Sequence, residues 1–96
     1  LKMCEREDTV TNWMTLIVKE MRRTGDRISD IEYTTLSNED LLKEFDSGSG
    51  GTEGKPFTLW TKEYVYFPFS YGGGAEGVAS ASRYPSSYAL KHIGGD

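Results

Sequence analysis

The spacing of apolar residues predicts a helix near the start of the chain. Apolar side chains recur every three or four residues, as on a helix with one buried stripe. The stripe consists of Val10, Trp13, Met14, Ile17, Val18 and Met21. Asp8 or Thr9 can cap its first N–H groups, and Gly25 can adopt the left-handed conformation that ends a helix. We therefore expect a helix from Thr9 to Thr24.

A short strand and a second helix are expected next. The segment Ile31–Thr35 is rich in β-branched residues, which favour strands. Ser37 is a good N-cap, and Leu36 before it can contact Leu41 as a hydrophobic staple. The pattern predicts a second helix from Asn38 to Phe45.

An aromatic stretch between two Gly-rich segments predicts a β-hairpin with strands near Phe57–Trp60 and Tyr64–Tyr71. A third strand is expected at Gly77–Ser82. Successive strand residues point to opposite faces, so one set in the second strand would face the core. We assign Val65, Phe67, Phe69 and Tyr71 to the core face, which leaves Tyr64 and Tyr66 on the other.

Pro68 restricts the strand order, because proline cannot donate a hydrogen bond within a sheet. We expect a bulge or break at Pro68, or an edge position for its strand.

The predicted fold class is α+β, with one long amphipathic helix and a short second helix on a small antiparallel sheet, either a hairpin or a meander. Residues 1–96 would form a single domain with a disordered N-terminus over 1–7 and a flexible Gly/Ser-rich loop over 46–55.

Charge is unevenly distributed along the chain. The net charge is −4, but the segment from Asp26 to Gly54 holds eight acidic and two basic residues, a net charge of −6. An acidic segment disfavours contact with nucleic-acid phosphates and favours a basic partner.

No basic-then-apolar leader opens the chain, and no apolar run approaches the roughly 20 residues that span a bilayer, so we expect a cytoplasmic protein without membrane contact.

No motif for catalysis or cofactor binding emerges. Cys4 and His92 are the only residues of their kinds, which excludes an internal disulfide and the usual Cys/His zinc site. The loop from Gly50 to Lys55 fails the spacing of a phosphate-binding loop. A calcium loop counted from Asp46 would have Gly48, Gly50 and Phe57 at positions that need oxygen ligands. We expect no cofactor, no metal and no enzymatic activity.

A protein-binding surface is the better interpretation, because Tyr and Trp are enriched at interface hot spots. The hypothesis combines the acidic middle of the chain with exposed aromatics of the hairpin. Its candidate partner-binding residues are Glu39, Asp40, Glu44, Asp46, Trp60, Tyr64 and Tyr66.

Several segments together resemble short bacterial and phage-type proteins of unknown function. These segments are Leu36–Leu41, Glu44–Asp46, Gly54–Thr61, Tyr64–Pro68 and His92–Gly95. The resemblance implies a protein that acts stoichiometrically, by binding and inhibiting or redirecting a host protein. In such proteins an acidic surface sometimes imitates nucleic acid.

The leading functional prediction is therefore a small non-enzymatic protein-binding module, a phage-type inhibitor or modulator, whose partner carries a basic surface. One alternative is a small enzyme or ligand-binding domain with its site between the two Gly-rich loops. Another is a structural component that associates with itself.

Overall fold

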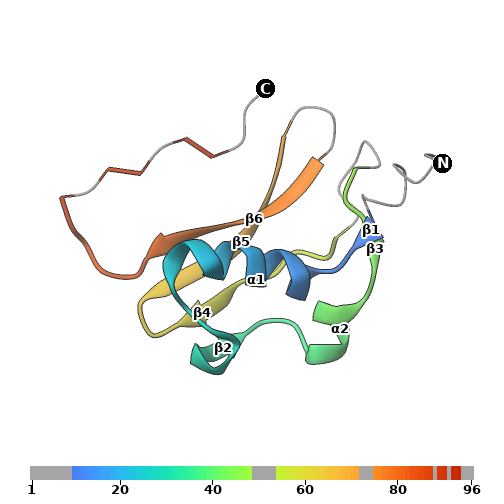
Figure 1. The fold of residues 1–96 in the computed structure, drawn as a ribbon, viewed down its shortest axis with the longest axis horizontal. Coiled ribbons are helices and arrows are strands. Elements are labelled where there is room, and N and C mark those ends of the chain that lie inside the picture. The colour runs from blue at the N-terminus through green and yellow to red at the C-terminus, as the bar shows by residue number, and fades with distance from the viewer. Residues whose placement is uncertain (1–9, 49–53, 72–74, 88, 91, 94–96) are drawn as a thin grey trace.

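The computed structural model describes residues 10–48, 54–71, 75–87, 89–90 and 92–93, and it confirms a small α+β fold (Figure 1). In chain order the elements are β1 (Val10–Thr11), α1 (Trp13–Thr24), a 3₁₀ turn (Ile28–Asp30), β2 (Ile31–Thr34), α2 (Asn38–Leu42), β3 (Phe45–Asp46), β4 (Leu59–Thr61), β5 (Tyr64–Tyr71) and β6 (Ala75–Ser82). The predicted N-terminal segment 1–7 and the centre of the predicted loop, residues 49–53, lie outside the described residues.

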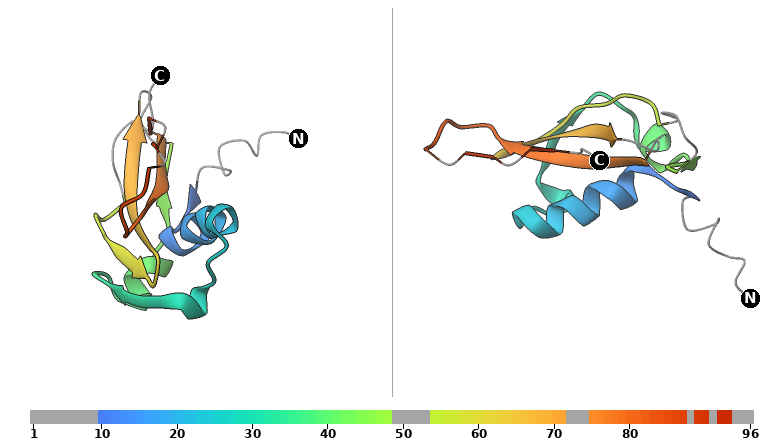
Figure 2. Two further views of the ribbon diagram at one scale, coloured as in Figure 1. Left: turned by 90° about the vertical axis from the view of Figure 1, so that its left-hand side faces the viewer. Right: turned by 90° about the horizontal axis from the view of Figure 1, so that it is seen from above.

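The strands form two antiparallel sheets. The larger sheet has the order β2-β4-β5-β6, and β1 pairs with β3 in a separate two-stranded ribbon. Helix α1 lies against one face of the larger sheet and α2 lies beyond one end of it, as the two views of Figure 2 show. In the described part of the chain, no helix covers the opposite face, which we call the outer face.

Helix α1 begins at Trp13, so the predicted start at Thr9 is wrong. Asn12 is the N-cap, and its side-chain oxygen accepts a hydrogen bond of 2.8 Å from the Thr15 N–H. The two preceding residues pair with β3 and are therefore unavailable to the helix. The predicted end is confirmed, because Gly25 has a φ of 90° and donates its N–H to the carbonyl of Met21.

Helix α2 ends at Leu42 rather than at Phe45. Lys43 has extended backbone angles, and the chain then enters β3, where Phe45 and Asp46 pair with β1. The ring of Phe45 lies 4.7 Å from that of Trp13, centroid to centroid. Contact with a buried indole and pairing with β1 thus end the helix early, and Asp46 belongs to a strand instead of the predicted loop.

The orientation of β5 is the reverse of the predicted one. Tyr66 is fully buried beneath α1, together with its β4 neighbours Leu59 and Thr61. Val65, Phe67 and Phe69 are half-buried and alternate with Tyr66, so they lie on the outer face.

Pro68 lies in β5 without a bulge, since β5 and β6 stay in register from Tyr64 to Tyr71. Among the described residues, β4 pairs only with the part of β5 that precedes Pro68, so the proline has a strand on one side alone. The N–H of Glu76 points away from β5 and donates to the carbonyl of Ser47. The N–H of Val78, two residues further along β6, points the same way, because N–H directions alternate along a strand. The expected edge position is wrong for the strand as a whole, because β5 lies between β4 and β6. Pro68 is tolerated because it faces Val78, a position that needs no N–H, beyond the part of β5 that pairs with β4.

The apolar stripe of α1 gives the first testable prediction. Ile17 is completely buried, so Ile17→Asp would place an unpaired charge in the core and should unfold the domain. Thr15→Asp introduces the same carboxylate at an exposed position of the first turn and should leave stability nearly unchanged. Thermal denaturation followed by circular dichroism compares the two variants, and an unchanged melting temperature for Ile17→Asp would contradict this packing.

Candidate functional site

A polar network around Tyr66 fixes the sheet against the C-terminal end of α1. The Tyr66 hydroxyl donates to Oδ2 of Asp26 at 2.7 Å and lies 2.7 Å from the hydroxyl of Thr24. Thr61 donates to the same Asp26 oxygen at 2.6 Å. Tyr66 was predicted to contact a partner, but its burial places it in the core, and we assign it a structural role.

The environment of Tyr66 keeps its hydroxyl protonated. Burial raises the pKa of Tyr66, and the hydrogen bond to the Asp26 carboxylate raises this pKa further, whereas the Thr24 hydroxyl lowers it. A phenol with a raised pKa is a poor proton donor near neutral pH. The network therefore supports the fold rather than acid–base chemistry.

The outer face of the sheet presents an aromatic surface. Trp60 of β4 pairs with Tyr33 of β2, and their ring centroids are 5.5 Å apart. Tyr33 is 61% exposed, and Trp60 is half-buried. The apolar members of this surface, which we call the outer aromatic face, are Tyr33, Trp60, Val65, Phe67 and Phe69.

Sequence reasoning missed Tyr33. In an unbroken strand Ile31 and Tyr33 would share one face, because side chains two residues apart point the same way. The register of β2 with β4 shifts between these two residues, so Ile31 pairs with the buried Thr61 while Tyr33 pairs with Trp60. An irregularity of this kind leaves no pattern in the sequence.

The third predicted aromatic, Tyr64, does not join this face. Its side chain is half-buried and packs against the core, and its N–H donates to the Thr61 hydroxyl at 3.1 Å across the hairpin turn. Of the three predicted aromatic site residues, only Trp60 lies on the outer aromatic face.

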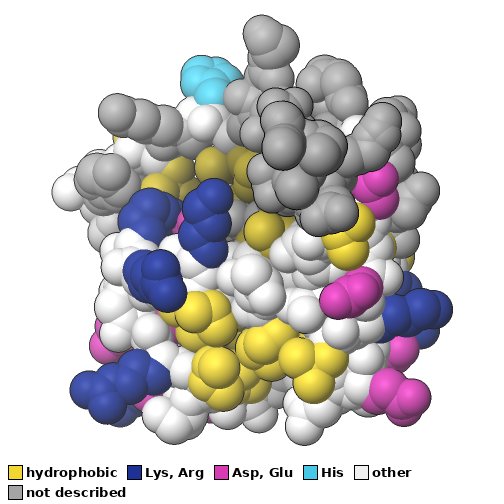
Figure 3. Space-filling view, turned by 45° about the vertical axis from the view of Figure 1, so that its right-hand side comes forward, with side chains coloured by type: hydrophobic (Ala, Val, Ile, Leu, Met, Phe, Trp, Pro, Cys, Tyr) yellow, Lys and Arg dark blue, Asp and Glu magenta, His cyan; other side chains and the backbone are white. Residues whose placement is uncertain are grey.

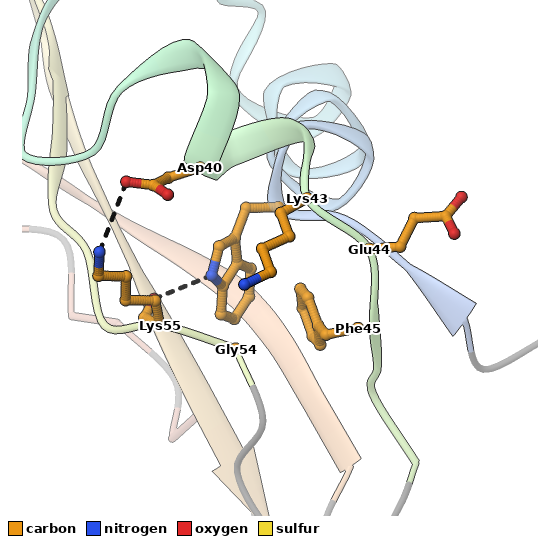
Figure 4. Close-up of a pocket in the computed structure, with 7 residues that line it drawn as sticks. Asp40, Lys43, Glu44, Phe45, Gly54 and Lys55 are labelled. Atoms are coloured by element: carbon orange, nitrogen blue, oxygen red, sulfur yellow. Dashed lines mark hydrogen bonds and ion pairs between the residues drawn. The ribbon is translucent and has the colours of Figure 1, made fainter.

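A cavity beside α2 brings together some of the predicted acids (Figure 4). It has a volume of about 540 Å³ and is lined by Trp13, Asp40, Lys43, Glu44, Phe45, Gly54 and Lys55. The indole N–H of Trp13 donates to the carbonyl of Lys55 at 2.9 Å. Gly54 lies so close to the indole that any side chain there would collide with it, which explains the glycine at this position.

The predicted acids do not form a continuous acidic surface. Asp40 lies 3.5 Å from the ammonium group of Lys55, and in Figure 4 Lys43 reaches over the cavity while Glu44 points away from it. Glu39 is exposed on α2, and Asp46 in β3 accepts a hydrogen bond from the N–H of Gly48. Two lysines are thus interspersed among the four acids.

The acids and the hairpin aromatics also lie apart. Figure 1 places α2 and β3 at one end of the molecule and the β4–β5 turn at the other. In the described part of the chain, the acids and the hairpin aromatics therefore do not share one surface. The alternative site between the two Gly-rich loops falls on residues 49–53 and 72–74, which lie outside the described residues.

The described residues contain no cluster of three or more His, Cys, Asp or Glu side chains arranged to hold a metal ion. No helix among them is long and apolar enough to cross a bilayer.

Comparison with protein-family models, curated proteins and solved structures finds no match.

The Tyr66 network predicts a specific pH dependence of stability. An unfolded tyrosine ionises near pH 10, and in the folded protein the pKa of Tyr66 is higher. The contribution of Tyr66 to stability is therefore complete below about pH 10 and declines as the pH rises further, because only the unfolded chain then releases the proton.

Tyr66→Phe provides the comparison. At neutral pH this variant should be less stable by about 1–3 kcal/mol, because the partly buried carboxylate of Asp26 loses a donor. In urea denaturation, the stability difference between wild type and variant should shrink above about pH 10. A difference that stays constant across the alkaline range would contradict the raised pKa of Tyr66.

Proposed function

We propose that this protein is a small non-enzymatic protein-binding module that contacts its partner through the outer aromatic face. The observation that carries the proposal is the Tyr33–Trp60 pair, two large aromatic side chains held side by side on strands with Tyr33 61% exposed. Aromatic side chains of this kind dominate the energy of protein interfaces, since they bury a large area at little cost in side-chain entropy.

The surroundings of the pair favour a protein partner. Arg83 lies between Glu32 at 3.2 Å and the carbonyl of Thr61 at 2.6 Å, so a charged rim borders the aromatic centre. Lys62 and Glu63 continue this rim at the hairpin turn and are exposed. An apolar centre with a mixed polar rim is typical of protein interfaces.

The mode of action that we propose is stoichiometric binding, in which the module occupies a functional surface of its partner. The aromatic pair is preorganised on the sheet, so little ordering is needed on binding. The acids of α2 lie at the far end of the molecule and would add contacts only to a partner large enough to reach both ends.

Substitution of Tyr33 tests the proposal. Because Tyr33 is exposed, Tyr33→Ser should leave the melting temperature nearly unchanged while weakening partner binding by about tenfold or more, as expected for a hot-spot residue. Crosslinking and affinity capture from a lysate of the native host would identify the partner, and titration calorimetry with the purified partner would measure the change.

Val10→Ser is the control. Val10 is also exposed, at 48%, but lies in β1, which belongs to the separate two-stranded ribbon and not to the sheet that carries the outer aromatic face. We expect this variant to bind like the wild type. Equal partner affinity for Tyr33→Ser and the wild type would refute the role of the outer aromatic face.

A further inference from the structure

We propose that a pocket beside Trp13 binds a primary ammonium group on an alkyl chain, with the carboxylate of Glu76 as its counter-charge. The pocket has a volume of about 330 Å³, enough for a small organic molecule or one long side chain. Its lining includes Trp13, Gly54, Pro56, Pro68, Ser70 and Glu76. Trp13 and Glu76 are buried, whereas Pro56 and Ser70 are exposed, so the pocket opens to solvent and leads to a buried carboxylate.

The carboxylate of Glu76 has unused capacity to accept hydrogen bonds. Glu76 of β6 is only 9% exposed, and the N–H of Gly54 lies 3.1 Å from its Oε1 and 3.4 Å from its Oε2. No lysine or arginine in the described part of the chain forms an ion pair with it. A carboxylate offers about four acceptor sites, and a buried charge is costly unless it is paired. A cation with N–H donors is therefore the group that this side of the pocket lacks.

The acids on the surface differ from Glu76 in this respect. Glu39 and Glu44 are exposed, and acidic side chains predominate at the right of the hydrophobic band that crosses the face shown in Figure 3. Water solvates such carboxylates, so an added cation gains little there. A cation beside Glu76 would interact more strongly, because the effective dielectric constant is lower away from water.

The remaining lining suits the rest of an alkylammonium ion. Ser70 pairs with Glu76 across β5 and β6, so both side chains lie on the same face of the sheet. The Ser70 hydroxyl forms no hydrogen bond with another described residue. An ammonium group has three N–H donors, which the two carboxylate oxygens and this hydroxyl would accept. Trp13, Pro56 and Pro68 provide apolar walls, which would contact the alkyl chain.

This ammonium site is separate from the proposed protein-binding surface. Ser70 and Glu76 lie on the same face of the sheet as Tyr66, which points toward α1, and the outer aromatic face is on the opposite side. Two sources carry the required group, namely a free alkylamine and the lysine side chain of another protein.

Titration with n-butylammonium chloride at constant ionic strength, followed by NMR, tests the site. Binding should shift the backbone N–H resonances of Gly54 and Ser70 and the indole N–H resonance of Trp13 in a saturable manner. n-Butanol has the same chain length without the charge and should give no saturable shift. Equal shifts with butanol, or no saturable shift with butylammonium, would overturn the proposal.

Two matched variants test the role of Glu76. Glu76→Gln keeps an acceptor for the Gly54 N–H but removes the charge, so it should bind butylammonium at least about tenfold more weakly. Glu63→Gln makes the same change at an exposed position of the hairpin turn and should bind like the wild type. Wild-type affinity in Glu76→Gln, or an equal loss in both variants, would contradict the proposal. If circular dichroism shows that Glu76→Gln is unfolded, the comparison of butylammonium with butanol on the wild-type protein decides.

A lysine with both backbone ends blocked, as the N-acetyl and N-methylamide derivative, distinguishes the two sources. Tighter binding of the blocked lysine than of butylammonium would identify a lysine side chain of another protein as the ligand. The reverse order would identify a free alkylamine, and both orders support an ammonium site. Failure of both compounds to bind would refute it.

Discussion

The hydrogen bond between the Tyr66 hydroxyl and Asp26 is the contact on which the rest of this structure depends. Asp26 follows Gly25, the C-cap of α1, so the bond joins the end of the helix to the centre of the sheet. Because strand side chains alternate, the inward position of Tyr66 decides the orientation of every neighbour in β4, β5 and β6. Leu59 and Thr61 turn inward with it, and Trp60 and Phe67 turn outward. The outer aromatic face is thus a consequence of one buried polar anchor.

Trp13 fixes the other end of α1, its first residue, to the rest of the fold. Its ring is buried between Phe45 and Phe57, with centroid distances of 4.7 and 4.9 Å. Its indole N–H also holds the backbone at Lys55. The helix is therefore anchored at both ends, and on its remaining outward side Thr15, Lys19 and Arg22 are exposed. The core and the outer aromatic face thus lie on opposite sides of the larger sheet.

The sequence was sufficient to predict the elements that depend on local patterns. The stripe of α1, the Ser37 cap of α2 and the hairpin around Lys62 and Glu63 all follow from spacing and capping. The orientation of β5 could not be predicted, because aromatic residues occupy both of its faces and the choice depends on Asp26, 40 residues away. The exposure of Tyr33 depends on a shift in strand register, and the early end of α2 depends on contact between Phe45 and Trp13. Each of these is a tertiary effect that local propensity does not encode.

The orientation of β5 is the central claim, because the aromatic binding face exists only if Tyr66 points inward. A soluble paramagnetic reagent broadens the NMR resonances of side chains that it can approach, so it measures this orientation directly. We predict strong broadening for Tyr33, clear broadening for Trp60 and Phe67, and protection of Tyr66 and Leu59. Broadened Tyr66 resonances together with protected Phe67 resonances would reverse the two faces of the sheet and contradict the account.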